Sequence, residues 1–240
     1  MTVLILGGTG DARRIAQALQ GTDAVISLAG ATRTPDPLPL STRIGGFGGD
    51  DGFRDYLRSE NITAVLDATH PFADRITQRT ARICAQLKLP YLQMLRPGWA
   101  AEFGDIWTEI ACEEDAAQHI PLGAVVFLGT GRQTLDRFAN LTGREVICRQ
   151  IDPPNGPFPF AGGRFLVGRP PFSTEDEMQL FSALGVTHLV VKNAGGAASR
   201  TKLTAAKHLS IPVLMITRPK RGDWPIVESV DAALDWVRDQ

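Results

Sequence analysis

Short apolar runs alternate with amphipathic stretches along most of the chain. Residues 3–6 form an apolar run typical of a buried strand, residues 7–10 form a glycine-rich turn, and residues 15–19 carry the apolar stripe of a helix. Strands separated by helices of about ten residues are typical of βαβ units and a parallel sheet. In the first half, the pattern predicts further strands at 23–28, 64–67 and 91–95 and helices at about 51–59 and 74–87.

The pattern begins again in the second half of the chain. An apolar run at 124–128 is followed by the turn Gly129-Thr130-Gly131-Arg132 and a predicted helix through about residue 141. The segment 152–159 is too rich in proline for a helix or a central strand. Further strands are expected at 145–149, 188–192 and 213–216, with helices at 174–184, at 201–208 and around Trp236.

Two repeats of this kind predict an α/β protein of two Rossmann-like domains with mainly parallel sheets and a ligand cleft between them. We expect an N-terminal nucleotide-binding domain over 1–97 and a C-terminal domain over 98–240 that contributes to substrate and cofactor binding. The pattern leaves open whether the terminal strand of either half joins the sheet of the other.

Composition narrows the classes of partner. The 240 residues carry a net charge of −1, so no global positive field attracts nucleic acid. Three dispersed cysteines without C-x-x-C spacing argue against a disulfide framework or a zinc site, and we expect no metal site. No apolar run approaches the roughly 18 residues of a membrane span, and no signal-peptide pattern precedes the first strand, so a cytoplasmic location is expected.

The turn at residues 7–10 predicts a phosphate site, because glycines let the backbone approach an anion and a helix N-terminus follows. An NAD-binding fold places a carboxylate about 20 residues beyond these glycines. That stretch has no carboxylate and ends in Arg33, which suits a 2′-phosphate, so NADPH is favoured; a solvated loop arginine is the alternative. Arg13 opposes the helix dipole, which an anionic ligand or a surface salt bridge would compensate.

Four segments occur in an order that points to one family. They are Gly7-Gly8-Thr9, Gly45-Gly46-Phe47-Gly48, the block from Asp67 to Ala73 (D-A-T-H-P-F-A), and Lys192-Asn193-Ala194-Gly195-Gly196. Together they resemble the precorrin-6A reductase family of cobalamin biosynthesis over nearly the whole chain, with Asp11 and Ala194 as small departures. The resemblance implies NADPH-dependent reduction of one double bond of the tetrapyrrole precorrin-6A to give precorrin-6B. The cobalt-containing substrate stays open, as does channelling between neighbouring pathway enzymes.

The candidate site residues follow the predicted strand ends. His70 is the candidate proton donor or positioning residue, since its ordinary pKa lies near neutrality. Clustered arginines match the many carboxylates of such a substrate, although scattered surface arginines are the alternative. The cofactor-binding candidates are Gly7, Gly8, Thr9, Gly10, Asp11, Arg13, Arg33, Gly45, Gly46, Thr69 and Pro71. The substrate-binding candidates are Thr130, Gly131, Arg132, Arg149, Arg164, Arg169, Lys192, Asn193, Gly195 and Gly196.

Competing classes can be weighed from the same residues. Short-chain dehydrogenases and sugar-nucleotide epimerases need a Tyr-x-x-x-Lys pair, whereas Tyr56 and Tyr91 are followed four residues later by Glu60 and Leu95. The pattern of an S-adenosylmethionine-binding methyltransferase is not evident either. A non-catalytic NADP(H)-binding regulatory module remains compatible with the first half of the chain.

Overall fold

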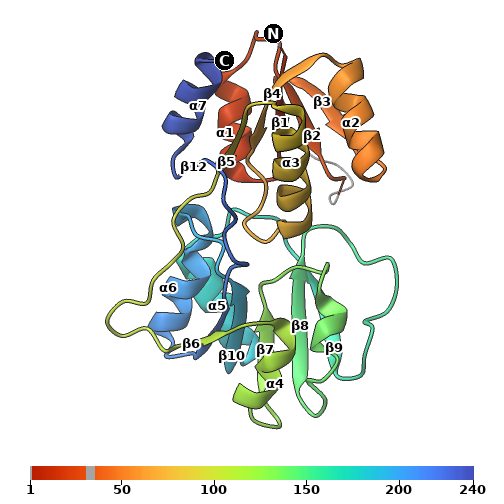
Figure 1. Ribbon diagram of the computed structural model, residues 1–240. Helices are drawn as coiled ribbons and strands as arrows, with labels where there is room; N and C mark the ends of the chain where they lie inside the picture. The colour runs from red at the N-terminus through yellow and green to blue at the C-terminus, as the bar shows by residue number, and fades with distance from the viewer. Residues whose placement is uncertain (1, 31–35) are drawn as a thin grey trace. The chain divides into compact units, whose positions relative to one another are not determined.

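The computed structural model describes residues 2–30 and 36–240 and divides into two compact units. Unit 1 comprises Met1–Pro97 and Pro219–Gln240, and unit 2 comprises Gly98–Arg218. Each unit holds one six-stranded sheet in which every pairing is parallel, with helices interspersed (Figure 1). The prediction of two Rossmann-like α/β halves is confirmed.

The sheet of unit 1 has the strand order β12-β5-β4-β1-β2-β3. Residues 3–6 of its central strand β1 are all apolar because both faces are covered: Val3 and Ile5 pack beneath α1 and α7, while Leu4 and Leu6 pack beneath α2 and α3. The elements are β1 (Thr2–Leu6), α1 (Gly10–Ala18), β2 (Val25–Leu28), β3 (Ser41–Ile44), α2 (Gly49–Ser59), β4 (Ile62–Asp67), α3 (Asp74–Leu87), β5 (Tyr91–Met94), β12 (Ile226–Val227) and α7 (Val230–Arg238).

The sheet of unit 2 has the order β6-β11-β10-β7-β8-β9. The described residues 151–162 form neither a helix nor a strand, as the prolines at 153, 154, 157 and 159 predict. The elements are β6 (Trp107–Ile110), η1 (Glu113–Asp115), α4 (Ala116–His119), β7 (Val125–Leu128), η2 (Leu135–Phe138), β8 (Glu145–Gln150), β9 (Gly163–Val167), α5 (Thr174–Leu184), β10 (His188–Lys192), η3 (Ala197–Ser199), α6 (Thr201–His208) and β11 (Val213–Ile216).

The two sheets share one topology in which the sixth strand is exchanged. After β5, the chain supplies β6 to the sheet of unit 2; after β11, it returns and supplies β12 to the sheet of unit 1. The helix α7 then buries Ala233, Leu234 and Val237 in the same core as α1 (Figure 1). The expected second domain of 98–240 therefore differs from the structure, in which residues 219–240 complete the core of unit 1.

The helix predicted to run through residue 141 is the one misassigned helix among those predicted for the described residues. The structure has only the 3-10 helix η2 there. Leu135, Phe138 and Leu141 are all buried at intervals of three residues, which matches the three residues per turn of a 3-10 helix rather than the 3.6 of an α-helix.

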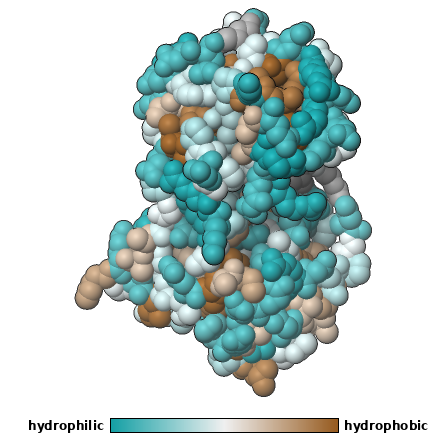
Figure 2. All heavy atoms as spheres, in the orientation of Figure 1, coloured by the Kyte–Doolittle hydropathy of each residue, from teal (hydrophilic) through white to brown (hydrophobic). Residues whose placement is uncertain are grey.

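The face in Figure 2 is largely hydrophilic, with apolar side chains in scattered groups. Within the described residues, no helix is long and apolar enough to cross a membrane.

Candidate functional site

The glycine turn after β1 leads directly into α1. A Cβ on Gly7 would lie 2.9 Å from Ile26 Cδ1 on β2, so a larger residue there would have to displace the side chain of Ile26. Gly8 has a φ of +116°, and a Cβ on Gly8 or Gly10 would meet nothing within 4 Å, which leaves open space over the turn. The N-cap of α1 is Thr9, whose Oγ1 accepts the N–H of Ala12 at 3.0 Å and donates to the carbonyl of Ala68 at 2.8 Å. The turn is a shaped, open helix N-terminus that suits a phosphate.

The carboxylate of Asp11 is buried next to this turn and accepts hydrogen bonds from two arginines. It accepts from Arg14 and, at 2.5 Å, from Nη1 of Arg96 beyond β5. Burial alone would raise the pKa of Asp11, but the hydrogen bonds from Arg96 and Arg14 hold it below its ordinary value. Asp11 therefore fixes Arg96 near the turn, and its negative charge beside the phosphate site is compensated.

Of the two arginines predicted to bind the cofactor, the structure describes only Arg13. Arg13 donates to the carbonyls of Asp36 and Pro37 and pairs with the Asp36 carboxylate at 3.4 Å, which is the salt bridge considered as the alternative. Arg33 lies outside the described residues.

The loop after β4 is organised by the buried carboxylate of Asp67. It accepts the N–H of Thr69 at 3.0 Å and three hydroxyls: Thr69 Oγ1 at 2.7 Å, Thr77 Oγ1 at 2.7 Å and Tyr91 Oη at 3.1 Å. Burial, together with this carboxylate, raises the pKa of Tyr91. Asp67 is thus committed to fixing the loop that carries the exposed His70.

The ring of His70 has one nitrogen engaged with its own loop. Nδ1 accepts the N–H of Phe72 at 3.3 Å, and the two rings are 5.8 Å apart. An accepting Nδ1 leaves Nε2–H as the donor of the neutral imidazole. Pro71, between them, is half-buried.

The turn after β3 holds Gly45 and Gly46, and Arg43 on β3, which the sequence did not point to, contacts both of them. Gly45 has a φ of +114°. Arg43 donates to the carbonyls of Gly45 at 2.5 Å and Gly46 at 2.6 Å, and its Cζ lies 3.9 Å from the centre of the Phe47 ring.

In unit 2, the turns after β7 and β10 lie at the carboxyl ends of neighbouring strands. Gly131 has a φ of +72°, and Gly195 and Gly196 have φ values of +68° and +84°. Thr130 Oγ1 donates to the adjacent Gly131 carbonyl at 3.4 Å, and Arg132 is exposed. The structure thus brings these five residues to one edge of the sheet.

The side chain of Asn193 joins two parts of unit 2. Its Oδ1 accepts the N–H of Trp99 at 2.8 Å, and its Nδ2 donates to the Trp99 carbonyl at 2.9 Å. Arg218 Nε donates to the Asn193 carbonyl at 2.7 Å. Asn193 therefore holds the segments by which the chain enters and leaves unit 2.

Besides Arg132, four other cations are predicted to bind substrate, and they differ in their surroundings. Arg149 makes a bidentate pair with buried Glu177 at 2.7 and 2.8 Å, and Lys192 lies 3.3 Å from buried Glu113. Arg164 pairs with Glu145, and both lie at the amino end of their strands, away from the carboxyl-end turns. Arg169 is exposed beyond β9.

A lysine not expected from the sequence lies at the same edge of unit 2. Lys202, at the start of α6, packs against Gly129 and donates to the Ser199 carbonyl at 2.6 Å. Burial, and to a lesser extent the Arg149 charge, lowers the pKa of Lys202 to about 8. No sequence motif marks it, because its burial depends on long-range packing.

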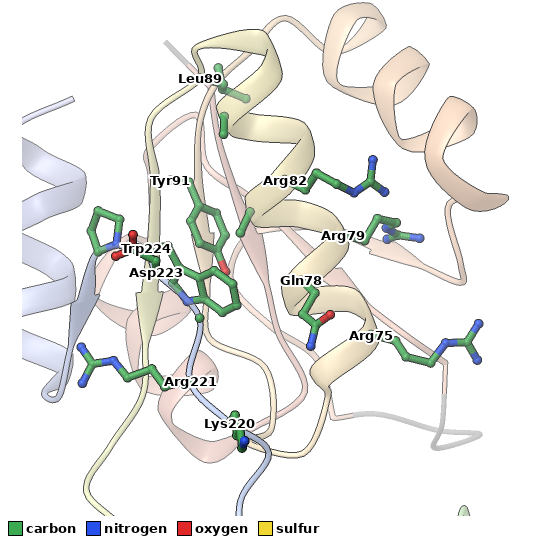
Figure 3. A pocket seen from close by; sticks show the side chains of 14 residues that line it. Arg75, Gln78, Arg79, Arg82, Leu89, Tyr91, Lys220, Arg221, Asp223 and Trp224 are labelled. Carbon is green, nitrogen blue, oxygen red and sulfur yellow. The ribbon is translucent and has the colours of Figure 1, made fainter.

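Described residues of unit 1 line two sizeable cavities, among others. One, of about 1010 Å³, runs between α3 and the 220–225 segment (Figure 3). Figure 3 shows Arg75, Arg79 and Arg82 extending from α3 on the side away from Trp224. The other, of about 560 Å³, lies between the starts of α2 and α3 and includes Phe72. None of the candidate site residues lines either cavity.

No group of three or more His, Cys, Asp or Glu residues that could hold a metal ion occurs in the described ranges. Cys84, Cys112 and Cys148 are free thiols.

Comparison with known proteins gives a consistent result. Residues 2–238 match the model of the family described as precorrin-6x reductase CbiJ/CobK. The chain is 40% identical to precorrin-6A reductase of Rhodobacter capsulatus, covering 99% of this chain and 96% of the relative. It is 43% identical to the enzyme of that name from Rhodococcus erythropolis, covering 98% and 96%. A solved structure named CobK precorrin-6A reductase superposes with a TM-score of 0.94 at 39% identity, covering 99% of this chain and 96% of that one.

Proposed function

Because the chain belongs to the precorrin-6x reductase CbiJ/CobK family, we propose that it catalyses NADPH-dependent reduction of one double bond of precorrin-6A to precorrin-6B. The observation that carries the proposal is the family match over residues 2–238 together with the fold match over 99% of the chain. A reductase of this family implies a nicotinamide cofactor; the choice of NADPH is part of the proposal.

The residues of unit 1 fit a dinucleotide. The open space over Gly8 and Gly10, at the capped N-terminus of α1, suits the diphosphate, and Arg96 adds a nearby positive charge. Gly45 and Gly46 follow β3, and Thr69 and Pro71 follow β4, at the carboxyl edge of the same sheet. All four are proposed to border the rest of the cofactor. The reduced nicotinamide supplies the hydride when bound.

His70 is proposed to orient a ligand or to donate the proton, through Nε2–H. His70→Ala is expected to lower kcat roughly 100-fold if it is the proton donor. His70→Gln, which keeps a donor, separates the roles: recovery of kcat in this variant supports positioning, and near-full turnover by His70→Ala contradicts the acid role.

The substrate carboxylates are proposed to meet the carboxyl edge of the sheet in unit 2. Arg132 and Arg169 are exposed and fit direct contact; Gly131, Gly195 and Gly196, with Thr130, offer backbone and hydroxyl donors. Arg149, Lys192 and Asn193 are proposed to support this edge through their internal partners. The Arg164–Glu145 pair at the opposite strand end does not support a contact by Arg164.

Anaerobic incubation with precorrin-6A tests the proposal, following the absorbance of NADPH and, separately, NADH. We expect substrate-dependent oxidation that is faster with NADPH. A second incubation with cobalt-precorrin-6A tests the alternative substrate. Nucleotide binding without oxidation in either incubation would identify a non-catalytic NADP(H)-binding module instead.

A further inference from the structure

Arg43 lies where a Rossmann fold reads the ribose of a dinucleotide. It is on β3, in register with Ser27 on β2, and its Nη1 lies 3.4 Å from Ser27 Oγ. The position 20 residues beyond the glycine turn is Gly30, where a Cβ would lie 3.4 Å from Ile44, the residue after Arg43. The ends of β2 and β3 therefore meet at the position from which the ribose 2′ substituent is recognised.

The guanidinium is held in one orientation before any ligand arrives. It lies against the ring of Phe47 at 3.9 Å and near that of Tyr56 at 5.1 Å, and it donates to the carbonyls of Gly45 and Gly46. A fixed arginine loses little entropy when it binds an anion.

Arg43 retains both charge and donors for a ligand. Within the described part of the chain it has no carboxylate partner, whereas Arg13, Arg58 and Arg82 each pair with an aspartate. Of its five N–H groups, Nη1 uses two, on Ser27 and Gly45, and Nη2 uses one, on Gly46. With respect to the described residues, Nε–H and one Nη2–H remain, and such a pair matches two oxygens of a phosphate.

We propose that Arg43 binds the 2′-phosphate of the cofactor and sets the preference for NADPH over NADH. This inference rests on the proposed function and adds the residue that selects the nucleotide. Arg33, outside the described residues, is the competing candidate.

Calorimetric titration of the full chain with 2′,5′-ADP and with 5′-AMP tests the proposal without turnover. Wild type is expected to bind 2′,5′-ADP more tightly. Arg43→Met, which keeps an apolar stem over Phe47, is expected to weaken 2′,5′-ADP roughly 10- to 100-fold, since hydrogen bonds to charged groups are lost. Binding of 5′-AMP stays unchanged, and the KM for NADPH rises while that for NADH does not.

The controls separate this role from a purely structural one. Arg58→Met removes an exposed arginine paired with Asp55 on α2 and leaves both affinities unchanged. Arg43→Lys, which keeps the charge, covers the case in which Arg43→Met does not fold, and it loses affinity for 2′,5′-ADP alone. Equal weakening of both ligands, or loss of discrimination only in Arg33→Met, overturns the inference while the reductase proposal stands. A wild type that binds both ligands equally overturns the inference and the choice of NADPH, whereas absent turnover with precorrin-6A concerns only the reaction.

Discussion

The turns after β1 and β7 occupy the same position in two sheets of the same topology, yet they lead to different structures. After β1, the buried residues Ala12, Ile15, Ala16 and Leu19 follow the spacing of an α-helix, and α1 forms with Thr9 as its cap. After β7, the interval of three residues gives only the 3-10 helix η2, without a side-chain cap.

This difference shows that a glycine-rich turn of the same sequence type does not by itself make a phosphate-binding site. A strand followed by Gly, Thr and Gly forms both turns, but only the first ends in an α-helix whose N–H groups and dipole attract a phosphate. We infer that the α-helix makes unit 1 the nucleotide-binding half.

The largest effect is expected from the buried ion pair of unit 2. Glu177→Ala leaves Arg149 buried without its carboxylate and is expected to cost about 3–5 kcal/mol in the free energy of unfolding, measured by urea titration. Asp11→Ala in unit 1 is expected to cost less, because Arg96 is more exposed, at 18% against 9% for Arg149. Equal losses in the two variants would contradict this contrast.

The lysine of unit 2 predicts a pH dependence of stability that unit 1 lacks at the corresponding place, since the second residue of α3 is Arg75 rather than a lysine. Because burial lowers the pKa of Lys202 from its ordinary 10.5 to about 8, the unfolded chain binds the extra proton between these values, and stability rises with pH in that window. The difference in unfolding free energy between wild type and Lys202→Met is expected to shift toward wild type by up to about 3 kcal/mol between pH 7.5 and 10.5. A difference that stays flat would show that the amine is solvated.

The smallest change in unfolding free energy is expected from replacing Thr9 and Thr130, the threonines of the two turns. Thr9→Ala removes the cap of α1 and the bond to Ala68, and is expected to cost about 1 kcal/mol and to weaken nucleotide binding. Thr130→Ala is expected to change the unfolding free energy by less than about 0.5 kcal/mol, because Thr130 caps no helix. Thermal unfolding and calorimetry of both variants measure the contrast, and matching losses would mean that the turns are equivalent.

Local patterns predicted much of the fold because local spacing determines it. The helix at 174–184 and the strands at 188–192 and 213–216 have the predicted bounds, and the turn at 7–10 meets the helix it was expected to meet. The sequence did not determine whether the two halves exchange strands, because β12 has only two residues and pairs with β5, more than 130 positions earlier. Such a pairing leaves no periodic signal.

The site was less predictable than the fold, because partners decide what a charged side chain does. Three residues of the recognised motifs have side chains that bind other residues of the protein. They are Asp11, which binds Arg96, Lys192, which binds Glu113, and Asn193, which binds Trp99. Arg43 stands in no motif and is recognised only through its contacts with Phe47 and the Gly45 turn.

The exchange of sixth strands also determines the order in which the two units can fold during synthesis on the ribosome. Residues 98–218 emerge with all six strands of their sheet, so unit 2 can close as soon as β11 leaves the exit tunnel. Unit 1, although begun first, must wait with an open sheet edge at β5 until β12 and α7 have also left the tunnel. A released chain that ends at residue 218 would therefore carry a finished second unit and an incomplete first one.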